Sequence, residues 1–131
     1  MAVLIDTNVI SDVIHADPLW EEWALARIAA NYGDLVINPV IYAELSCRAE
    51  SVEALDAILE PFELDYFEIP KQALFLAAQA FLKYRKRGGT KSSPLPDFFI
   101  GAHAAALEVP LLTRDVARYQ TYFPEVELIA P

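Results

Sequence analysis

Residues 3–14 read VLIDTNVISDVI, a short apolar run that stops at a carboxylate. The run Val3–Ile5 is typical of a buried β-strand, and Asp6 or Thr7 can cap a helix that follows it. The pattern returns near the other end of the chain, where VPLLTRDVARY carries apolar residues into Asp115. We therefore expect two strands that each end beside a carboxylate.

Between these two stretches, short apolar runs alternate with helical patterns. Strands are expected at residues 2–5, 35–38, 65–69, 109–113 and 126–130. Helices are expected at residues 7–15, 18–32, 39–50, 52–62, 70–87, 97–107 and 115–123. The alternation predicts an α/β fold in which a mostly parallel sheet of about five strands has helices on both faces. Such sheets place their sites beyond the carboxyl ends of the strands.

Two of the expected helices have distinctive apolar patterns. The helix at 97–107 is apolar nearly all round, which predicts that it is buried. The helix at 70–87 carries a single apolar stripe, which together with the apolar excess suggests a dimer. That stripe consists of Leu74, Ala77, Ala78, Phe81 and Leu82.

The composition fits one folded domain over residues 1–131. Apolar residues make up 55 % of the chain, which leaves room for a buried homo-oligomer or partner surface. The one cysteine, Cys47, cannot form an internal disulfide. No stretch resembles a secretion signal or a membrane span, so we expect a cytoplasmic protein without a membrane partner.

The formal net charge is −9, which argues against a protein that holds nucleic acid by charge alone. Half of the 10 Lys and Arg residues nevertheless fall in one short stretch, here called the basic segment. It consists of Lys83, Arg85, Lys86, Arg87 and Lys91. Two interpretations stay open: a solvated helix end whose cations suit the helix dipole, or a patch that contacts the substrate.

Three aspartates stand at or near the starts of expected helices. Asp6, Asp97 and Asp115 could each be a simple helix cap. Asp6 also follows one parallel strand directly, and Asp115 follows another after a short gap, so their side chains should share one edge of the sheet. Asp97 begins the buried helix, which holds it near that edge. Gly101 follows on the same helix face, where it leaves space beside the carboxylate or allows close helix packing.

Glu44 is unusual because it falls within an apolar stripe. Val40, Ile41 and Leu45 define the inward stripe of their helix, and Glu44 lies among them. A core-facing carboxylate is costly unless it is paired or bound to a metal. A buried pair with Arg or Lys, or a side chain that reaches water at the stripe's margin, is the alternative.

Acids that converge at one sheet edge would repel one another and raise some of their pKa values. A hard divalent cation relieves this repulsion, because Mg²⁺ and Mn²⁺ prefer carboxylate oxygens. Such ions can activate water and stabilise the oxygens of a phosphodiester displacement. They also supply positive charge where the chain as a whole is negative.

The spaced motifs LIDTNVI, PVIYAEL, PDFFIGAHA and LLTRD resemble those of the PIN-domain family, in this order and over essentially the whole chain. Order and length are most similar to the VapC-type toxins of toxin–antitoxin pairs. The resemblance implies a three-layer α/β/α domain that cleaves RNA with Mg²⁺ or Mn²⁺. It also implies a homodimer and a cognate antitoxin that occludes the site.

By position, the resemblance assigns the metal-binding and catalytic acids to Asp6, Glu44, Asp97 and Asp115, here called the carboxylate cluster. Asp6 and Asp97 would hold the first ion, and the other two acids would complete the site or hold a second ion. Thr113 and Asn8 match polar positions beside the acids. Arg114 and the basic segment are our candidates for contacts to flanking RNA phosphates.

Two other functions compete with a ribonuclease. One is an inactive member of the same fold that only binds a partner. The other is a different Mg²⁺-dependent phosphohydrolase, for which a phosphoaspartate mechanism would want a second Asp close to Asp6. Among the remaining residues, we expect packing or surface roles for His103 and packing for Tyr119 and Tyr122.

Overall fold

The computed structural model describes residues 1–92 and 95–131, and its centre is a five-stranded sheet. The strands are β1 (Val3–Ile5), β2 (Leu35–Ile37), β3 (Asp65–Tyr66), β4 (Leu111–Leu112) and β5 (Leu128–Ile129). Their order is β3-β2-β1-β4-β5, and every neighbouring pair is parallel. The predicted parallel sheet is confirmed, and the carboxyl ends of the two central strands, β1 and β4, lie side by side.

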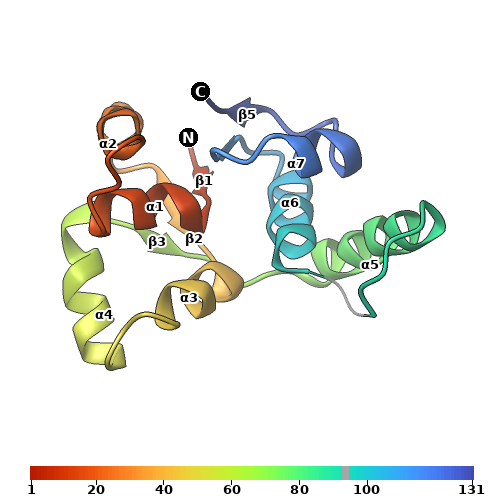
Figure 1. The fold of residues 1–131 in the computed structure, drawn as a ribbon, viewed down its shortest axis with the longest axis horizontal. Coiled ribbons are helices and arrows are strands. Elements are labelled where there is room, and N and C mark those ends of the chain that lie inside the picture. The colour runs from red at the N-terminus through yellow and green to blue at the C-terminus, as the bar shows by residue number, and fades with distance from the viewer. Residues whose placement is uncertain (93–94) are drawn as a thin grey trace.

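Seven α-helices and one 3-10 helix surround this sheet in the described part of the chain. They are α1 (Thr7–Ile14), α2 (Glu21–Ala30), α3 (Pro39–Ser46), α4 (Val52–Leu59), η1 (Glu60–Phe62), α5 (Lys71–Lys86), α6 (Pro96–Leu107) and α7 (Ala117–Tyr122). Helices α1 to α4 gather on one side of the strands and α5 to α7 on the other (Figure 1). The predicted α/β/α layering is confirmed.

The core combines the strands with apolar residues of the helices around them, including α6. Every residue of β1 and β2 is buried, and so are both residues of β4. Helix α6 buries Phe98 and Ile100 completely, which confirms that it is an internal helix. The remaining buried positions of α6 are small, apart from His103, whose Nδ1 accepts a hydrogen bond from Asn38 over 3.0 Å. His103 therefore has the packing role expected of it.

Several helices are shorter than the sequence predicts. Helix α2 begins at Glu21, not at residue 18, because the carboxylate of Asp17 accepts the N–H groups of Leu19 and Trp20 and forms a separate turn. Helix α4 gives way to the 3-10 turn η1 because Pro61 has no N–H for an α-helical hydrogen bond. None of the helices in the described ranges is long and apolar enough to cross a membrane.

Most of the apolar stripe of α5 lies on the outer surface of the chain, although Ala77 is buried. Leu74 is 43 % exposed and Leu82 is 55 % exposed. The buried face consists of Ala73, Ala77 and Ala80. These small side chains let α5 pack closely along α6, which is the most extensive helix–helix contact of the fold. The larger apolar residues are left on the outer face.

Candidate active site

Asp6 lies at the centre of the site, directly after β1. Its side chain is 4 % exposed, and its backbone N–H continues the sheet by donating to Leu112. Oδ1 accepts the N–H of Thr7 over 2.8 Å, so Asp6 does cap α1, as the capping alternative predicted. Oδ2 accepts hydrogen bonds from the hydroxyls of Thr113, over 2.8 Å, and Tyr119, over 3.0 Å. A helix cap alone would not need these buried donors.

Burial raises the pKa of Asp6 to about 6, because the charged form loses its water. The hydrogen bonds from Thr113 and Tyr119 oppose that rise, and the negative charge of Asp97 adds to it. The ionised carboxylate is therefore destabilised in the metal-free protein, despite its donors.

Thr113 and Asn8 connect Asp6 to the loop that carries Asp115. Thr113 is fully buried at the end of β4, where its Oγ1 also accepts the N–H of Asp115 over 3.0 Å. Asn8 accepts the N–H of Arg114 over 3.3 Å and reaches Asp6 Oδ2 through Nδ2 over 3.4 Å. Both residues therefore lie where the sequence predicted, next to the acids. Asp115 itself is exposed and does not cap α7, which begins at Ala117.

Glu44 reaches the site from α3. It is half-buried, and its Oε1 accepts a hydrogen bond from Thr7 Oγ1 over 2.6 Å. Its neighbours Ile41 and Leu45 are buried, so Glu44 lies at the margin of the inward stripe. The cationic partner proposed as an alternative is not seen among the described residues, where the hydroxyl of Thr7 takes that place.

Asp97 lies in the first turn of α6 and completes the carboxylate cluster. Its Oδ1 is 3.5 Å from the hydroxyl of Tyr119, and its Oδ2 is 3.6 Å from Nε of Arg118. Burial raises the pKa of Asp97, the charges of Asp115 and Glu44 raise it further, and Arg118 opposes the rise. Asp97 therefore interacts electrostatically with the other three acids.

Oxygen donors make the carboxylate cluster chemically suited to a hard divalent cation. In residues 1–92 and 95–131, however, no three acidic, His or Cys side chains are close enough to form a ready-made metal site. Protein groups occupy the carboxylate oxygens instead: Tyr119 and Thr113 on Asp6, and Arg118 beside Asp97. The donors fit the ion in kind, and loading it would require the side chains to draw closer.

Gly101 serves packing rather than space beside the acids. A Cβ at this position would collide with the ring of Phe123, which is buried against α6. Of the two roles that the sequence left open, close packing is the one the structure supports.

Four residues of the site were not anticipated as such. Thr7, Tyr119 and Arg118 contact the acids directly, and Asp12 holds Arg114. Asp12 accepts two hydrogen bonds, from Arg114 Nε over 2.5 Å and from Nη2 over 2.9 Å. The Arg114 guanidinium also lies 5.2 Å from the ring centre of Trp20. Arg114 is thus engaged within the protein, although the sequence suggested a contact with RNA phosphate.

The basic segment lies at the C-terminal end of α5 and in the loop beyond it. All five of its cations are exposed. Arg85 donates to the carbonyl oxygen of Lys91 over 2.6 Å, which folds the loop back on the helix. The glycines, serines and prolines of GGTKSSPLP, residues 88–96, predict a loop, of which residues 93 and 94 lie outside the described residues.

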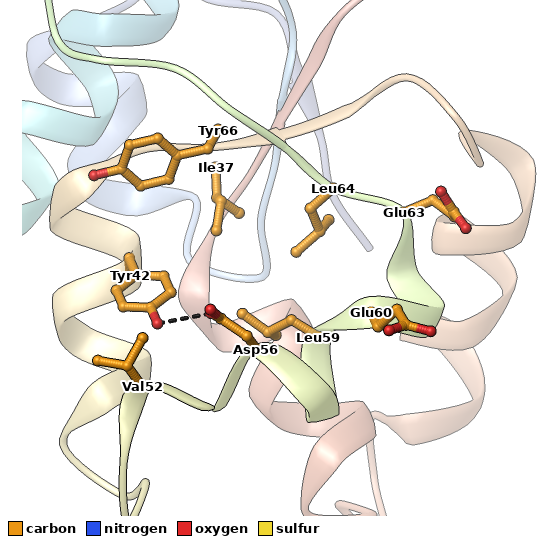
Figure 2. Close-up of a pocket in the computed structure, with 9 residues that line it drawn as sticks. All are labelled: Ile37, Tyr42, Val52, Asp56, Leu59, Glu60, Glu63, Leu64 and Tyr66. Carbon is orange, nitrogen blue, oxygen red and sulfur yellow. Dashed lines mark hydrogen bonds between the residues drawn. The ribbon is translucent and has the colours of Figure 1, made fainter. Parts of the chain in front are cut away.

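A pocket of about 630 Å³ lies away from the carboxylate cluster. Figure 2 shows it between α3, α4 and the edge strand β3. Tyr42 donates to Asp56 across it over 2.8 Å, and Glu60 and Glu63 lie at one end. It shares no residue with the acids described above.

The fold and the site together define an α/β domain with acids gathered beyond the carboxyl ends of its central strands. Residues 3–124 match the family model of the PIN domain, so the chain belongs to the PIN-domain family. The resemblance seen in the motifs is thereby confirmed. No curated protein sequence gives a significant match.

Solved structures show the same fold. A chain of VapBC2 from Rickettsia felis, bound to a promoter DNA fragment, is 20 % identical with a TM-score of 0.73, covering 100 % of this chain and 99 % of that one. A chain of DNA-bound VapBC from Salmonella typhimurium is 18 % identical with a TM-score of 0.74, covering 99 % and 98 %. A chain of VapBC-1 from nontypeable Haemophilus influenzae is 20 % identical with a TM-score of 0.74, covering 99 % of this chain and 98 % of that one.

Proposed function

We propose that this protein is a metal-dependent endoribonuclease that acts as the toxin of a toxin–antitoxin pair. The observation that carries the proposal is the buried Asp6, held by Thr113 and Tyr119 beside Asp97 in a PIN domain. A structural role alone would not favour burying an acid whose charged form is destabilised. The similarity of the fold to VapBC chains supports the toxin assignment.

Asp6 and Asp97 would hold the first Mg²⁺ or Mn²⁺ ion, and Glu44 and Asp115 would complete the site. The bound ion would supply positive charge for the scissile phosphate and lower the pKa of an attacking water. Thr7 orients Glu44, and Thr113 orients Asp6, through the hydrogen bonds described above. These hydroxyls restrict the rotation of the carboxylates, which reduces the ordering that metal binding would otherwise require.

The test compares the wild-type protein with Asp6→Asn on total cellular RNA, each with and without Mg²⁺ or Mn²⁺. We expect cleavage by the wild type only when metal is present, and loss of cleavage in the variant. Asp56→Asn, which changes an acid in the distant pocket of Figure 2, is the matched control and should cleave like the wild type. Intact RNA in all cases, with partner binding retained, would favour the inactive binding module.

The partner that we propose is an antitoxin that carries a run of arginine or lysine residues. The chain has a net charge of −9, and its carboxylate cluster already accommodates the guanidinium of Arg118 beside Asp97. An antitoxin arginine could engage a carboxylate through two hydrogen bonds and would compete with metal for it. Titration of the antitoxin against the wild type and an Asp6→Asn, Asp97→Asn double variant, each with and without Mn²⁺, tests this. Equal affinity in all four titrations would place the antitoxin elsewhere.

A homodimer is supported by the outer face of α5. Its exposed apolar residues include Leu74, Phe75 and Leu82, which are 43 %, 65 % and 55 % exposed. A second copy of the chain would remove this surface from water. Light scattering after size-exclusion chromatography should give twice the chain mass, and Phe75→Glu should shift the protein to monomer. A monomeric wild type at micromolar concentration would contradict the dimer.

A further inference from the structure

A second, smaller pocket of about 370 Å³ opens beside the carboxylate cluster. Its lining residues come from the C-terminal half of α5 and from the segment around α7: Tyr84, Asp115, Ala117, Arg118, Thr121 and Tyr122. Asp115 belongs both to this pocket and to the cluster. A molecule that occupied the pocket would therefore lie next to the acids.

Aromatic rings form the walls of this pocket. The ring centres of Tyr84 and Tyr122 are 6.5 Å apart, with an angle of 68° between the rings. Phe98 lies behind them, 5.7 Å from Tyr84 and 5.4 Å from Tyr122, and is completely buried. Tyr84 and Tyr122 are only half-buried. Phe98 is thus a core residue, whereas the two tyrosines keep ring surface exposed to the pocket.

Arg118 contributes a cation whose hydrogen bonds are incomplete. Its guanidinium carbon is 5.6 Å from the ring centre of Tyr84 and 5.4 Å from that of Phe98. Its Nε faces Asp97, but its Nη1 is buried and has no hydrogen-bond partner among the described residues. Arg118 also lines the pocket with a side chain that is 31 % exposed, so a phosphate oxygen in the pocket can pair with its positive charge. Arg114, by contrast, is already paired through two nitrogens with Asp12.

The basic segment borders the same pocket. The Arg87 guanidinium lies 5.5 Å from the ring centre of Tyr122, and the N–H of Lys91 is 3.4 Å from the hydroxyl of Tyr84. Gly89 permits this approach, because a Cβ there would collide with the Tyr84 ring. Positive charge in this acidic chain is thus concentrated beside the pocket that Tyr84 and Tyr122 line.

We propose that this pocket is a subsite for one nucleotide of a single-stranded RNA, next to the bond that is cut. The base stacks on Tyr122 and Tyr84, and the adjoining phosphate pairs with the exposed part of the Arg118 side chain. Only an unpaired nucleotide offers a free base face to such rings. The inference rests on the proposed nuclease function and adds the position and chemistry of a substrate contact.

The test measures binding of a short fluorescent single-stranded RNA by anisotropy in Mg²⁺. Every protein in this comparison carries Asp6→Asn, so that the RNA stays intact. Tyr122→Leu should weaken binding about ten- to a hundredfold, because base stacking on an aromatic ring is lost. Tyr122→Phe keeps the ring and should bind within about twofold of the parent. Tyr66→Leu removes a tyrosine from the pocket of Figure 2 and is the matched control.

Arg118→Ala should weaken binding and reduce the slope of log affinity against log salt by about one, because one phosphate contact is lost. Thermal unfolding of each variant checks that the fold persists. A set of RNAs, each lacking one base at a different position, separates a loss of stacking from a folding defect. At one of these positions, removal of the base should weaken binding to the Asp6→Asn parent protein but not to the protein that also carries Tyr122→Leu.

Parallel cleavage assays in the wild-type background separate the two proposals. If wild-type protein does not cut RNA in the presence of metal, the nuclease function fails and the subsite with it. If it cuts RNA, but Tyr122→Leu and Tyr122→Phe bind and cut alike, the subsite alone is overturned. The subsite is also overturned if removing a base affects the parent and Tyr122→Leu equally.

Discussion

Tyr119 donates a hydrogen bond from its hydroxyl to Oδ2 of Asp6 over 3.0 Å, although 113 positions separate the two residues. Both side chains are buried, and the same hydroxyl is 3.5 Å from Asp97 Oδ1. A hydroxyl has one proton to donate, so it can satisfy only one of these carboxylates at a time. Tyr119 thus holds Asp6 in place in the metal-free protein and stands between two acids that repel each other.

Tyr119→Phe should therefore raise the pKa of Asp6 above about 6, because the tyrosine hydrogen bond lowers it. The metal-free protein should lose about 1–3 kcal/mol of stability near neutral pH, the usual cost of removing a hydrogen bond to a charged group. Carboxyl NMR titration and urea unfolding measure the two effects. Tyr122→Phe, outside the carboxylate cluster, is the control and should change neither. An unchanged Asp6 pKa in Tyr119→Phe would contradict the assigned bond.

Asp6→Asn should stabilise the metal-free protein, and the gain should depend on pH. The folded-state pKa of Asp6, about 6, lies above its ordinary value of 3.8, so the contribution of Asp6 to stability is full below that ordinary value and is lost as the pH rises through about 6. The variant should therefore exceed the wild type by up to about 3 kcal/mol near neutral pH and match it near pH 4. Urea unfolding in EDTA at several pH values measures this, and a gain that does not vary with pH would count against it.

Divalent metal should stabilise the wild-type protein. A cation at a hundred times its Kd should raise the Tm by roughly 10 °C, because it binds the folded state and relieves repulsion among the acids. Asp97→Asn should reduce that rise, and its metal-free form should be at least as stable as the wild type. Thermal unfolding with and without Mn²⁺ measures both quantities. Glu63→Gln, in the distant pocket, should respond to Mn²⁺ like the wild type, and an Asp97→Asn response of wild-type size would exclude Asp97 as a ligand.

Arg114→Ala should destabilise the protein by about 3–5 kcal/mol, because it leaves the buried carboxylate of Asp12 without its partner. Arg114→Lys should recover only part of this loss, since an ammonium cannot reproduce the two parallel hydrogen bonds. Arg48→Ala, at an exposed position, should cost less than about 0.5 kcal/mol. Equal stability of Arg114→Ala and Arg48→Ala would show that the ion pair contributes nothing.

The parts of the fold that followed from the sequence were those with a strong local pattern. The apolar runs that end at Asp6 and Thr113 became neighbouring central strands, and the all-apolar helix became the internal α6. The sequence did not show which face of α5 packs inside the chain, because both of its faces are apolar. Helix–helix distance decided the outcome: alanines allow close packing against α6, whereas Leu74 and Leu82 do not.

The acids of the site were found from their positions, because strand ends and helix periodicity are visible in the sequence. Tyr119 and Arg118 were missed because an aromatic residue and an arginine on a short helix have the same pattern whether they pack, face water or contact an acid. Their roles depend on the packing of α7 against α6, which no local pattern specifies. Thr7 stood beside Asp6 in the sequence, but its bond to Glu44 spans 37 positions.

The span between Asp6 and Tyr119 also limits when the site can exist during synthesis. Asp6 emerges from the ribosome long before Thr113 and Tyr119, which follow it by 107 and 113 positions. Strand β1 can pair with β2 early, but its other edge waits for β4. A nascent chain that has not yet delivered α7 therefore lacks the tyrosine donor that holds Asp6. The carboxylate cluster can therefore assemble only after most of the chain has been synthesised. Truncated chains that end before β4 cannot complete it.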